Sequence, residues 1–186
     1  MQDFIVFDDI DKHGPQTYKR TYDISADDLA RDEVVAVGPV TIEATVKKGD
    51  LAAEYIADGS VSFALDLECA RCTDPYPFAN PSTFHLRLRP RPEGAEPLTE
   101  EVEIAPDDLD VEFYSERTIP LRDLATEQIQ LMIPMKPLCD DECLGLCPKC
   151  GINRNRETCT CEETVNDERW GALKDFREGL MKKKQS

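Results

Sequence analysis

Residues 139–161 read CDDECLGLCPKCGINRNRETCTC and hold six of the eight cysteines in the chain. The other two lie upstream, in the segment Cys69-Ala70-Arg71-Cys72. The spacings CxxC, CxxxC, CxxC and CxC divide the thiols into two sets of four. Four thiolates complete the tetrahedral coordination of one zinc ion. The sequence therefore predicts a fold built around two structural zinc ions.

The downstream cysteines are expected to form a compact site of their own. Cys147 and Cys150 flank a tight turn, in which Gly151 lets backbone N–H groups point at the sulfurs. Cys159 and Cys161 supply a second pair across a short loop. If the other four cysteines share a second ion, that ion closes a loop of about seventy residues. Local sequence does not dictate this pairing, so the sequence leaves open which cysteines share which ion. The predicted metal ligands are Cys69, Cys72, Cys139, Cys143, Cys147, Cys150, Cys159 and Cys161.

The cysteines have two alternative uses. Disulfide bonds are typical of secreted proteins, but residues 1–9 are acidic and alternating, unlike the basic and apolar start of a secretion signal. No run approaches the ~20 apolar residues of a membrane span. We therefore expect a cytoplasmic protein without membrane contact. Because thiolates also hold iron, a thiolate–iron redox protein is the alternative function.

The sequence indicates no enzyme. Catalytic zinc usually keeps a position for water and has His or carboxylate ligands, but the two histidines, His13 and His85, lie far from the cysteines in sequence. The nine glycines are scattered and form no phosphate-binding loop, and no G-x-S-x-G motif is present. We expect no catalytic residue, no bound organic cofactor and no small-molecule substrate.

The charge distribution restricts the class of partner. The net charge is −16; residues 1–146 hold 31 acidic and 13 basic side chains, and residues 147–186 hold seven and nine. Such an acidic body disfavours non-specific binding to phosphate backbones and favours a basic protein partner. RNA contact through local basic patches stays open. The candidate basic residues are His85, Arg87, Arg89 and Arg91 on one strand face, and Lys149, Arg154 and Arg156 around the second site.

Hydrophobic periodicity predicts the fold class. Alternation of apolar and polar residues predicts strands at 40–47, 51–55, 61–68 and 84–89, with turns at Gly49-Asp50 and Asp58-Gly59. A proline- and glutamate-rich loop (90–108) separates them from a short strand, Val111–Tyr114, that returns to the sheet. An apolar stripe predicts a helix over about 120–133 that Pro134 ends, and another stripe predicts a last helix, with Asn166 as its N-cap and Trp170, Leu173, Phe176 and Leu180 on one face.

The predicted fold is α+β: an antiparallel β meander or partial barrel with one core helix, a Cys-rich zinc-knuckle module and a C-terminal helix. We expect residues 1–134 to form the acidic β-rich domain, including the core helix. Residues 135–186 are expected to form the zinc-binding module and the last helix.

The ordered motifs resemble one family over nearly the whole chain. They are the strand end with Cys69 and Cys72, the segment 133–139 after the helix, the run 143–153 with the CxC pair after it, and residues 166–173. This set is similar to the YceD-like family, the large ribosomal RNA subunit accumulation proteins. Arg154 stands where that pattern would have Leu.

The resemblance implies a non-enzymatic bacterial factor, with plastid relatives, that supports accumulation of 23S ribosomal RNA. It implies a ribosomal protein or ribosome assembly factor as the partner, with ribosomal RNA as a further possible partner. It carries the eight cysteines over as the metal ligands and transfers no RNA-contacting residue.

Overall fold

The computed structural model describes residues 3–91 and 110–161. Helices are α1 (Phe7–His13), the 3-10 turn η1 (Asp27–Leu29) and α2 (Leu121–Met132). The strands are β1 (Phe4–Val6), β2 (Gln16–Tyr22), β3 (Val34–Val37), β4 (Val40–Lys48), β5 (Tyr55–Ser62), β6 (Leu65–Glu68), β7 (Pro75–Phe78), β8 (Ser82–Pro90), β9 (Val111–Tyr114) and β10 (Thr118–Pro120).

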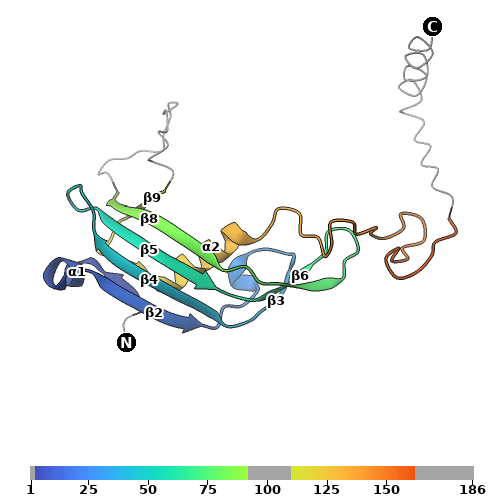
Figure 1. Ribbon diagram of the computed structural model, residues 1–186, viewed down its shortest axis with the longest axis horizontal. Coiled ribbons are helices and arrows are strands. Elements are labelled where there is room, and N and C mark those ends of the chain that lie inside the picture. The colour runs from blue at the N-terminus through green and yellow to red at the C-terminus, as the bar shows by residue number, and fades with distance from the viewer. Residues whose placement is uncertain (1–2, 92–109, 162–186) are drawn as a thin grey trace, which may run out of the picture.

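Two sheets lie one after the other along an elongated molecule (Figure 1). The main sheet has the order β2-β4-β5-β8-β9, in which only β9 runs parallel to its neighbour, and the small sheet has the order β3-β6-β7. Strands β1 and β10 form a separate antiparallel pair. The predicted α+β class is therefore confirmed, and the strand at 111–114 does return to the main sheet.

One long hairpin connects the two sheets. Strand β4 pairs with β5 in the main sheet, and the same two chain segments pair again as β3 and β6 in the small sheet. Between the two sheets the Gly38 N–H donates to the carbonyl of Ala64, 2.8 Å away, which keeps the segments together where the regular pairing is interrupted. The hairpin therefore carries the chain from the main sheet directly to Cys69.

The core lies between the main sheet and α2. On β4 the apolar positions of the predicted alternation are fully buried: Val40, Ile42, Ala44 and Val46. Helix α2 packs against β4, β5 and β8 with the predicted apolar face, since Leu121, Leu124, Ala125 and Ile129 are all at most 1% exposed. The helix ends before Pro134, which cannot continue the backbone hydrogen bonding.

Helix α1 was not predicted. Phe7 and Ile10 are its buried residues, three positions apart, and the Phe7 ring stacks on Tyr55 at a centroid distance of 4.2 Å. Asp8 and Asp9 lie in its first turn, where the helix dipole favours them, and Gly14 ends it at φ +80°. These signals were present in the sequence, but seven residues between two strands are too few for a clear helical period.

The predicted strand at 51–55 and the hairpin turn at Asp58-Gly59 are wrong. Residues 49–54 form the turn, and β5 runs straight through Asp58 and Gly59. The reason is Glu54, whose side chain is 1% exposed and binds Arg87 at 3.0 Å and Arg89 at 2.9 Å. Its carboxylate also accepts the Leu51 N–H, which folds the turn around the buried charge.

Gly59 is required in β5 for close packing rather than for a turn. A Cβ at this position would lie 2.4 Å from Cζ of Phe84 and 2.5 Å from the carbonyl oxygen of Glu43. We expect Gly59→Ala to lower the free energy of unfolding by about 2 kcal/mol, because the backbone oxygen cannot move away. Urea denaturation measures this, with Ser60→Ala as the matched control; equal stability of the two variants would contradict the packing account.

The predicted loop at 90–108 lies outside the described residues except for its first two positions. The predicted C-terminal helix lies entirely outside them. None of the helices within 3–91 and 110–161 is long and apolar enough to span a membrane.

Candidate metal centres

The first cysteine pair lies at the tip of the hairpin that β6 and β7 form. The Cys69 N–H donates to the carbonyl of Asp74, and the Thr73 N–H donates back to the carbonyl of Cys69. Thr73 takes up the left-handed conformation (φ 58°) that closes this turn. The turn thereby presents the sulfurs of Cys69 and Cys72 to the same side.

The segment that follows α2 brings the other half of this cluster. The Ala70 N–H donates to the carbonyl of Pro137, 2.8 Å away. The Arg71 guanidinium donates to the carbonyls of Asp141 (2.9 Å) and Cys143 (2.8 Å). Arg71 is therefore a structural residue that holds the Cys139–Cys143 loop against the hairpin, a role that the sequence analysis missed.

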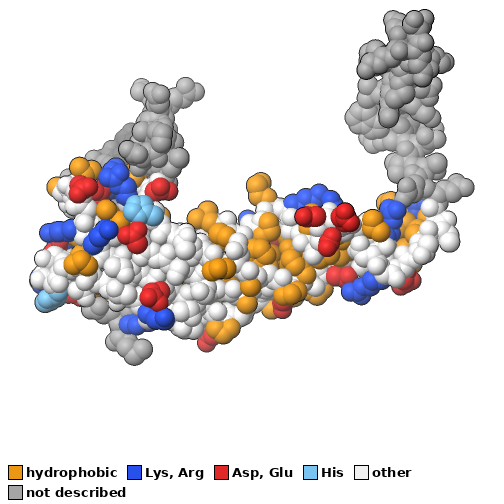
Figure 2. Space-filling view, viewed as in Figure 1, with side chains coloured by type: hydrophobic (Ala, Val, Ile, Leu, Met, Phe, Trp, Pro, Cys, Tyr) orange, Lys and Arg blue, Asp and Glu red, His pale blue; other side chains and the backbone are white. Residues whose placement is uncertain are grey.

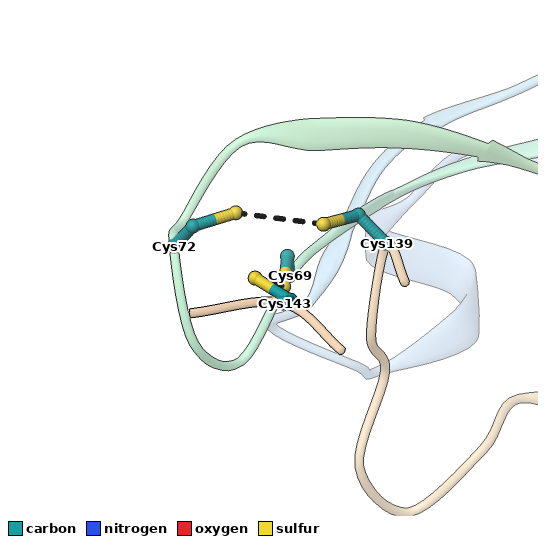
Figure 3. A group of neighbouring side chains, drawn as sticks. All are labelled: Cys69, Cys72, Cys139 and Cys143. Carbon is teal, nitrogen blue, oxygen red and sulfur yellow. Dashed lines mark hydrogen bonds between the residues drawn. The ribbon is translucent and has the colours of Figure 1, made fainter. Parts of the chain in front are cut away.

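The four sulfurs of this first cluster converge (Figure 3). Those of Cys69, Cys72, Cys139 and Cys143 all lie within 4.8 Å of one another. The Cys69–Cys143 separation is 3.9 Å and the Cys72–Cys139 separation is 3.6 Å. A tetrahedron with metal–sulfur bonds of about 2.3 Å has edges of about 3.8 Å, whereas a disulfide requires about 2.0 Å. The geometry fits a tetrathiolate metal centre.

The second cluster is formed within one short stretch of chain. The Cys147 N–H donates to the carbonyl of Ile152, and the Gly151 N–H donates to the carbonyl of Cys147, with Gly151 at φ 74°. Cys159 lies 3.3 Å from the sulfur of Cys147 and 3.6 Å from that of Cys150. With Cys161, these sulfurs again lie within 4.8 Å of one another. The structure thus brings together the compact downstream set that the spacing predicts, and it also groups the other four cysteines.

Each cluster favours one thiolate and disfavours others. Burial raises the pKa of Cys69, but backbone N–H groups of Cys139, Cys72 and Arg71 lower it to about 6. Backbone N–H groups of Cys150 and Lys149 likewise lower the pKa of Cys147 to about 6. Desolvation and thiol neighbours raise the pKa of Cys139 to about 12. Neighbouring thiolates repel one another. A bound cation would offset this repulsion, and it would therefore favour deprotonation of all four thiols of a cluster.

A hydrogen-bonded connection links the two clusters. The Leu146 N–H donates to the carbonyl of Arg71, and Gly145 (φ 72°) allows this approach, since a Cβ there would lie 2.9 Å from the same oxygen. Asp74 accepts a hydrogen bond from Asn153 and pairs with Arg156 at 2.9 Å. The predicted basic residue Arg156 is therefore engaged with the hairpin of the first cluster.

Asn155 touches the first cluster directly and was also missed. Its Nδ2 lies 3.2 Å from the sulfur of Cys143, and its Oδ1 accepts the Leu144 N–H at 2.7 Å. The sequence shows only an amide twelve residues after a cysteine, so no local spacing could reveal this contact. Hydrogen bonds of this kind orient a ligand and stabilise its thiolate.

We expect Asn155→Asp to lower the metal affinity of the first cluster by about 10- to 100-fold, because a carboxylate replaces the donor beside the Cys143 sulfur. Competition against a chromophoric chelator measures this. The control is Gln16→Glu, the same amide-to-acid change on β2. An unchanged affinity in Asn155→Asp would show that the Asn155 contact does not support the ligand.

The predicted basic strand face is partly occupied. Arg87 and Arg89 both bind the buried carboxylate of Glu54, and His85 lies 2.6 Å from Asp58. Neither histidine belongs to a cysteine cluster. Three of the four residues proposed for that face therefore have carboxylate partners within the protein.

The fold and the clusters define a class: an α+β protein whose long hairpin and C-terminal segment are joined by cysteine clusters with the geometry of metal centres. Residues 57–177 match the family described as "Large ribosomal RNA subunit accumulation protein YceD". Because this match covers most of the chain and includes all eight cysteines, the chain belongs to the YceD family.

Three curated relatives illustrate the similarity. A protein of Arabidopsis thaliana named "Large ribosomal RNA subunit accumulation protein YCED homolog 1, chloroplastic" is 36% identical over 63 residues, which are 34% of this chain and 18% of that protein. Its namesake from Zea mays is 27% identical over 144 residues, 66% of this chain and 48% of that protein. An uncharacterized protein of Mycobacterium tuberculosis is 29% identical over 130 residues, which are 67% of this chain and 58% of that protein.

The chain thus spans less than two thirds of the length of these relatives. No solved structure matches it.

Proposed function

We propose that this chain is a non-enzymatic, zinc-stabilised factor that supports the accumulation of large-subunit (23S) ribosomal RNA and ribosome assembly in the cytoplasm. The observation that carries the proposal is the family match over residues 57–177, which includes both cysteine clusters. The names of the plant relatives describe the same role for those proteins. The partner we propose is a ribosomal protein or an assembly factor, with pre-ribosomal RNA as the other candidate.

We propose zinc as the metal, with all eight cysteines as its ligands in two centres. Four sulfur donors per centre, without histidine, favour zinc in a closed structural site. When bound, zinc cross-links the four sulfurs and stabilises their thiolate forms. The backbone N–H groups, Arg71 and Asn155 hold the sulfurs in place, so their part is structural and involves no chemical step.

The division of the chain at residue 134 is part of this proposal. Residues 1–134 would act as the acidic body and residues 135–186 as the zinc-binding module. Cys69 and Cys72 belong to the first part and Cys139 and Cys143 to the second, so the first cluster joins them.

Complementation tests the function. In a bacterial strain that lacks its own YceD-family gene, we expect a lowered ratio of 23S to 16S ribosomal RNA, and we expect this chain to restore it. Quantitative hybridisation of total RNA measures the ratio. An unchanged ratio on loss of the gene, or no recovery with a well-expressed chain, would contradict the proposal.

The thiolate–iron alternative makes a different prediction. Ferric tetrathiolate centres absorb visible light, and reduction bleaches them reversibly. We expect the protein purified without added metal to be colourless. A visible band that a reductant removes would replace the zinc proposal with redox chemistry.

A further inference from the structure

A groove runs between the start of the small sheet and the segment that follows α2. One depression, of about 330 Å³, has Asp32, Glu33, Glu68, Met135 and Pro137 in its lining. A second, of about 320 Å³, has Asp27, Arg31, Asp32 and Val34 in its lining. Because they share Asp32, we treat them as one surface feature, here called the acidic groove and defined by Asp27, Asp32, Glu33, Glu68 and Met135.

The groove holds more acidic than basic side chains. Its carboxylates are those of Asp27, Asp32, Glu33 and Glu68, whereas Arg31 lines it and Lys136 lies between Met135 and Pro137. Arg31 pairs with Glu33 at 2.6 Å, so these two side chains neutralise each other. Asp27, Asp32 and Glu68 are exposed, and no Lys or Arg among residues 3–91 and 110–161 forms an ion pair with them. Three carboxylates therefore face solvent along one short surface, where a cationic segment would find attraction and a phosphate backbone repulsion.

The groove also offers an apolar contact. Met135 is 99% exposed, beside the buried Pro137, whose carbonyl accepts the Ala70 N–H. A fully exposed methionine on a well-anchored segment is an adaptable surface for a partner side chain. In Figure 2, hydrophobic side chains gather between the main sheet and the cysteine-rich end, with both acidic and basic side chains next to them.

We propose that the acidic groove binds an extended basic segment of a partner protein, with Lys or Arg on Asp27, Asp32 and Glu68 and an apolar side chain on Met135. This inference rests on the proposed function, whose partner class it specifies. Charge complementarity favours this occupant over RNA, because three unpaired carboxylates would repel phosphate. The groove needs no large rearrangement, since both of its walls belong to hydrogen-bonded segments.

The test uses a fluorescein-labelled synthetic peptide in which Lys and Arg alternate with Leu. Fluorescence anisotropy measures its binding at about 0.15 M salt, because long-range electrostatic attraction is largely screened there. We expect Asp32→Lys/Glu68→Lys to weaken binding at least about tenfold, since like charges replace opposite ones. The control, Asp50→Lys/Glu116→Lys, makes the same change in net charge at exposed positions outside the groove and is expected to bind within about twofold of the unchanged chain.

A second pair of variants tests the apolar contact without altering charge. We expect Met135→Ser to weaken peptide binding severalfold and Leu51→Ser, at a residue 54% exposed in the turn before β5, to leave it unchanged. Equal losses in the groove and control variants would show bulk charge attraction and overturn the proposal. Tighter binding of an RNA oligonucleotide than of the peptide to the unchanged chain would overturn it as well.

The complementation strain separates this inference from the proposed function. Circular dichroism first checks that Asp32→Lys/Glu68→Lys folds. If this folded variant restores 23S ribosomal RNA as well as the unchanged chain does, the groove is not the functional docking site. The inference then fails, while the proposed function stands. If the unchanged chain does not restore 23S ribosomal RNA, the proposed function fails.

Discussion

If each cysteine cluster binds one zinc ion, as proposed, Cys72→Ser is expected to reduce the zinc content from two ions per chain to one and to cause a large loss of stability. Cys72 is 2% exposed and its sulfur lies 3.6 Å from that of Cys139. Serine has nearly the same size but is a poor zinc ligand, so the variant removes metal binding with little change in packing. If zinc is free at about 1,000 times its dissociation constant, losing the site costs about 4 kcal/mol of unfolding free energy.

Cys159→Ser provides the matched comparison in the second cluster. It should also remove one zinc, but that cluster closes only the short loop 150–159, whereas the first closes residues 72–139. The difference in loop-closure entropy is about 1–2 kcal/mol in favour of the first cluster. We therefore expect thermal unfolding of the main sheet to respond more to Cys72→Ser. Two zinc ions retained in Cys72→Ser would mean that the four sulfurs do not form one centre.

Glu54→Gln is expected to destabilise the main sheet by about 3 kcal/mol. The carboxylate of Glu54 is 1% exposed, and it accepts hydrogen bonds from Arg87, Arg89 and the Leu51 N–H. Removing its charge takes away the buried carboxylate that Arg87 and Arg89 share, and breaking a buried ion pair in this way costs about 3–5 kcal/mol. The lower figure applies because the Arg87 and Arg89 side chains are 27% and 25% exposed.

The same carboxylate makes stability depend on pH. Burial raises the pKa of Glu54, but hydrogen bonds from Arg89 and the Leu51 N–H, and the charge of Arg87, hold it below its ordinary value of 4.5. The stabilisation is therefore fully present above about pH 4.5 and is lost as the pH falls through the folded-state pKa. Denaturant melts at several pH values measure this. Carboxylates titrate roughly between pH 6 and pH 3. Over this range Glu54→Gln, which lacks the buried carboxylate, should lose less unfolding free energy than the control Asp66→Asn, which keeps Glu54 and changes an exposed residue.

Local patterns in the sequence predicted the parts of the fold that depend on neighbouring residues. The alternation along Val40–Lys48 and the stripe on Leu121–Met132 arise from burial of one face, so periodicity reveals them. The second cysteine cluster follows from the same kind of local constraint, because its four ligands are closely spaced in the sequence. The first cluster joins cysteines about seventy residues apart, and local spacing does not dictate that pairing. These patterns were sufficient for the α+β class and for the second cluster.

Features that depend on distant residues were missed. Asp58-Gly59 has the composition of a hairpin turn, but Gly59 is needed because Phe84 and Glu43 lie against it from neighbouring strands. The chain does turn at the predicted Gly49-Asp50, but the turn extends to residue 54, because Glu54 pairs with arginines more than thirty residues away. Arg71 and Asn155 contact the first cluster through hydrogen bonds that the spacing of residues in the sequence does not indicate. In each case the deciding contact is tertiary.

Metal content combined with X-ray absorption at the zinc edge, on protein purified without added metal, tests the central claim most directly. The account predicts about two zinc ions per chain, each with four sulfur ligands at about 2.3 Å and no nitrogen or oxygen ligand. Iron in place of zinc, nitrogen or oxygen in the first coordination sphere, or metal-free protein with the eight cysteines oxidised would contradict two closed structural zinc centres.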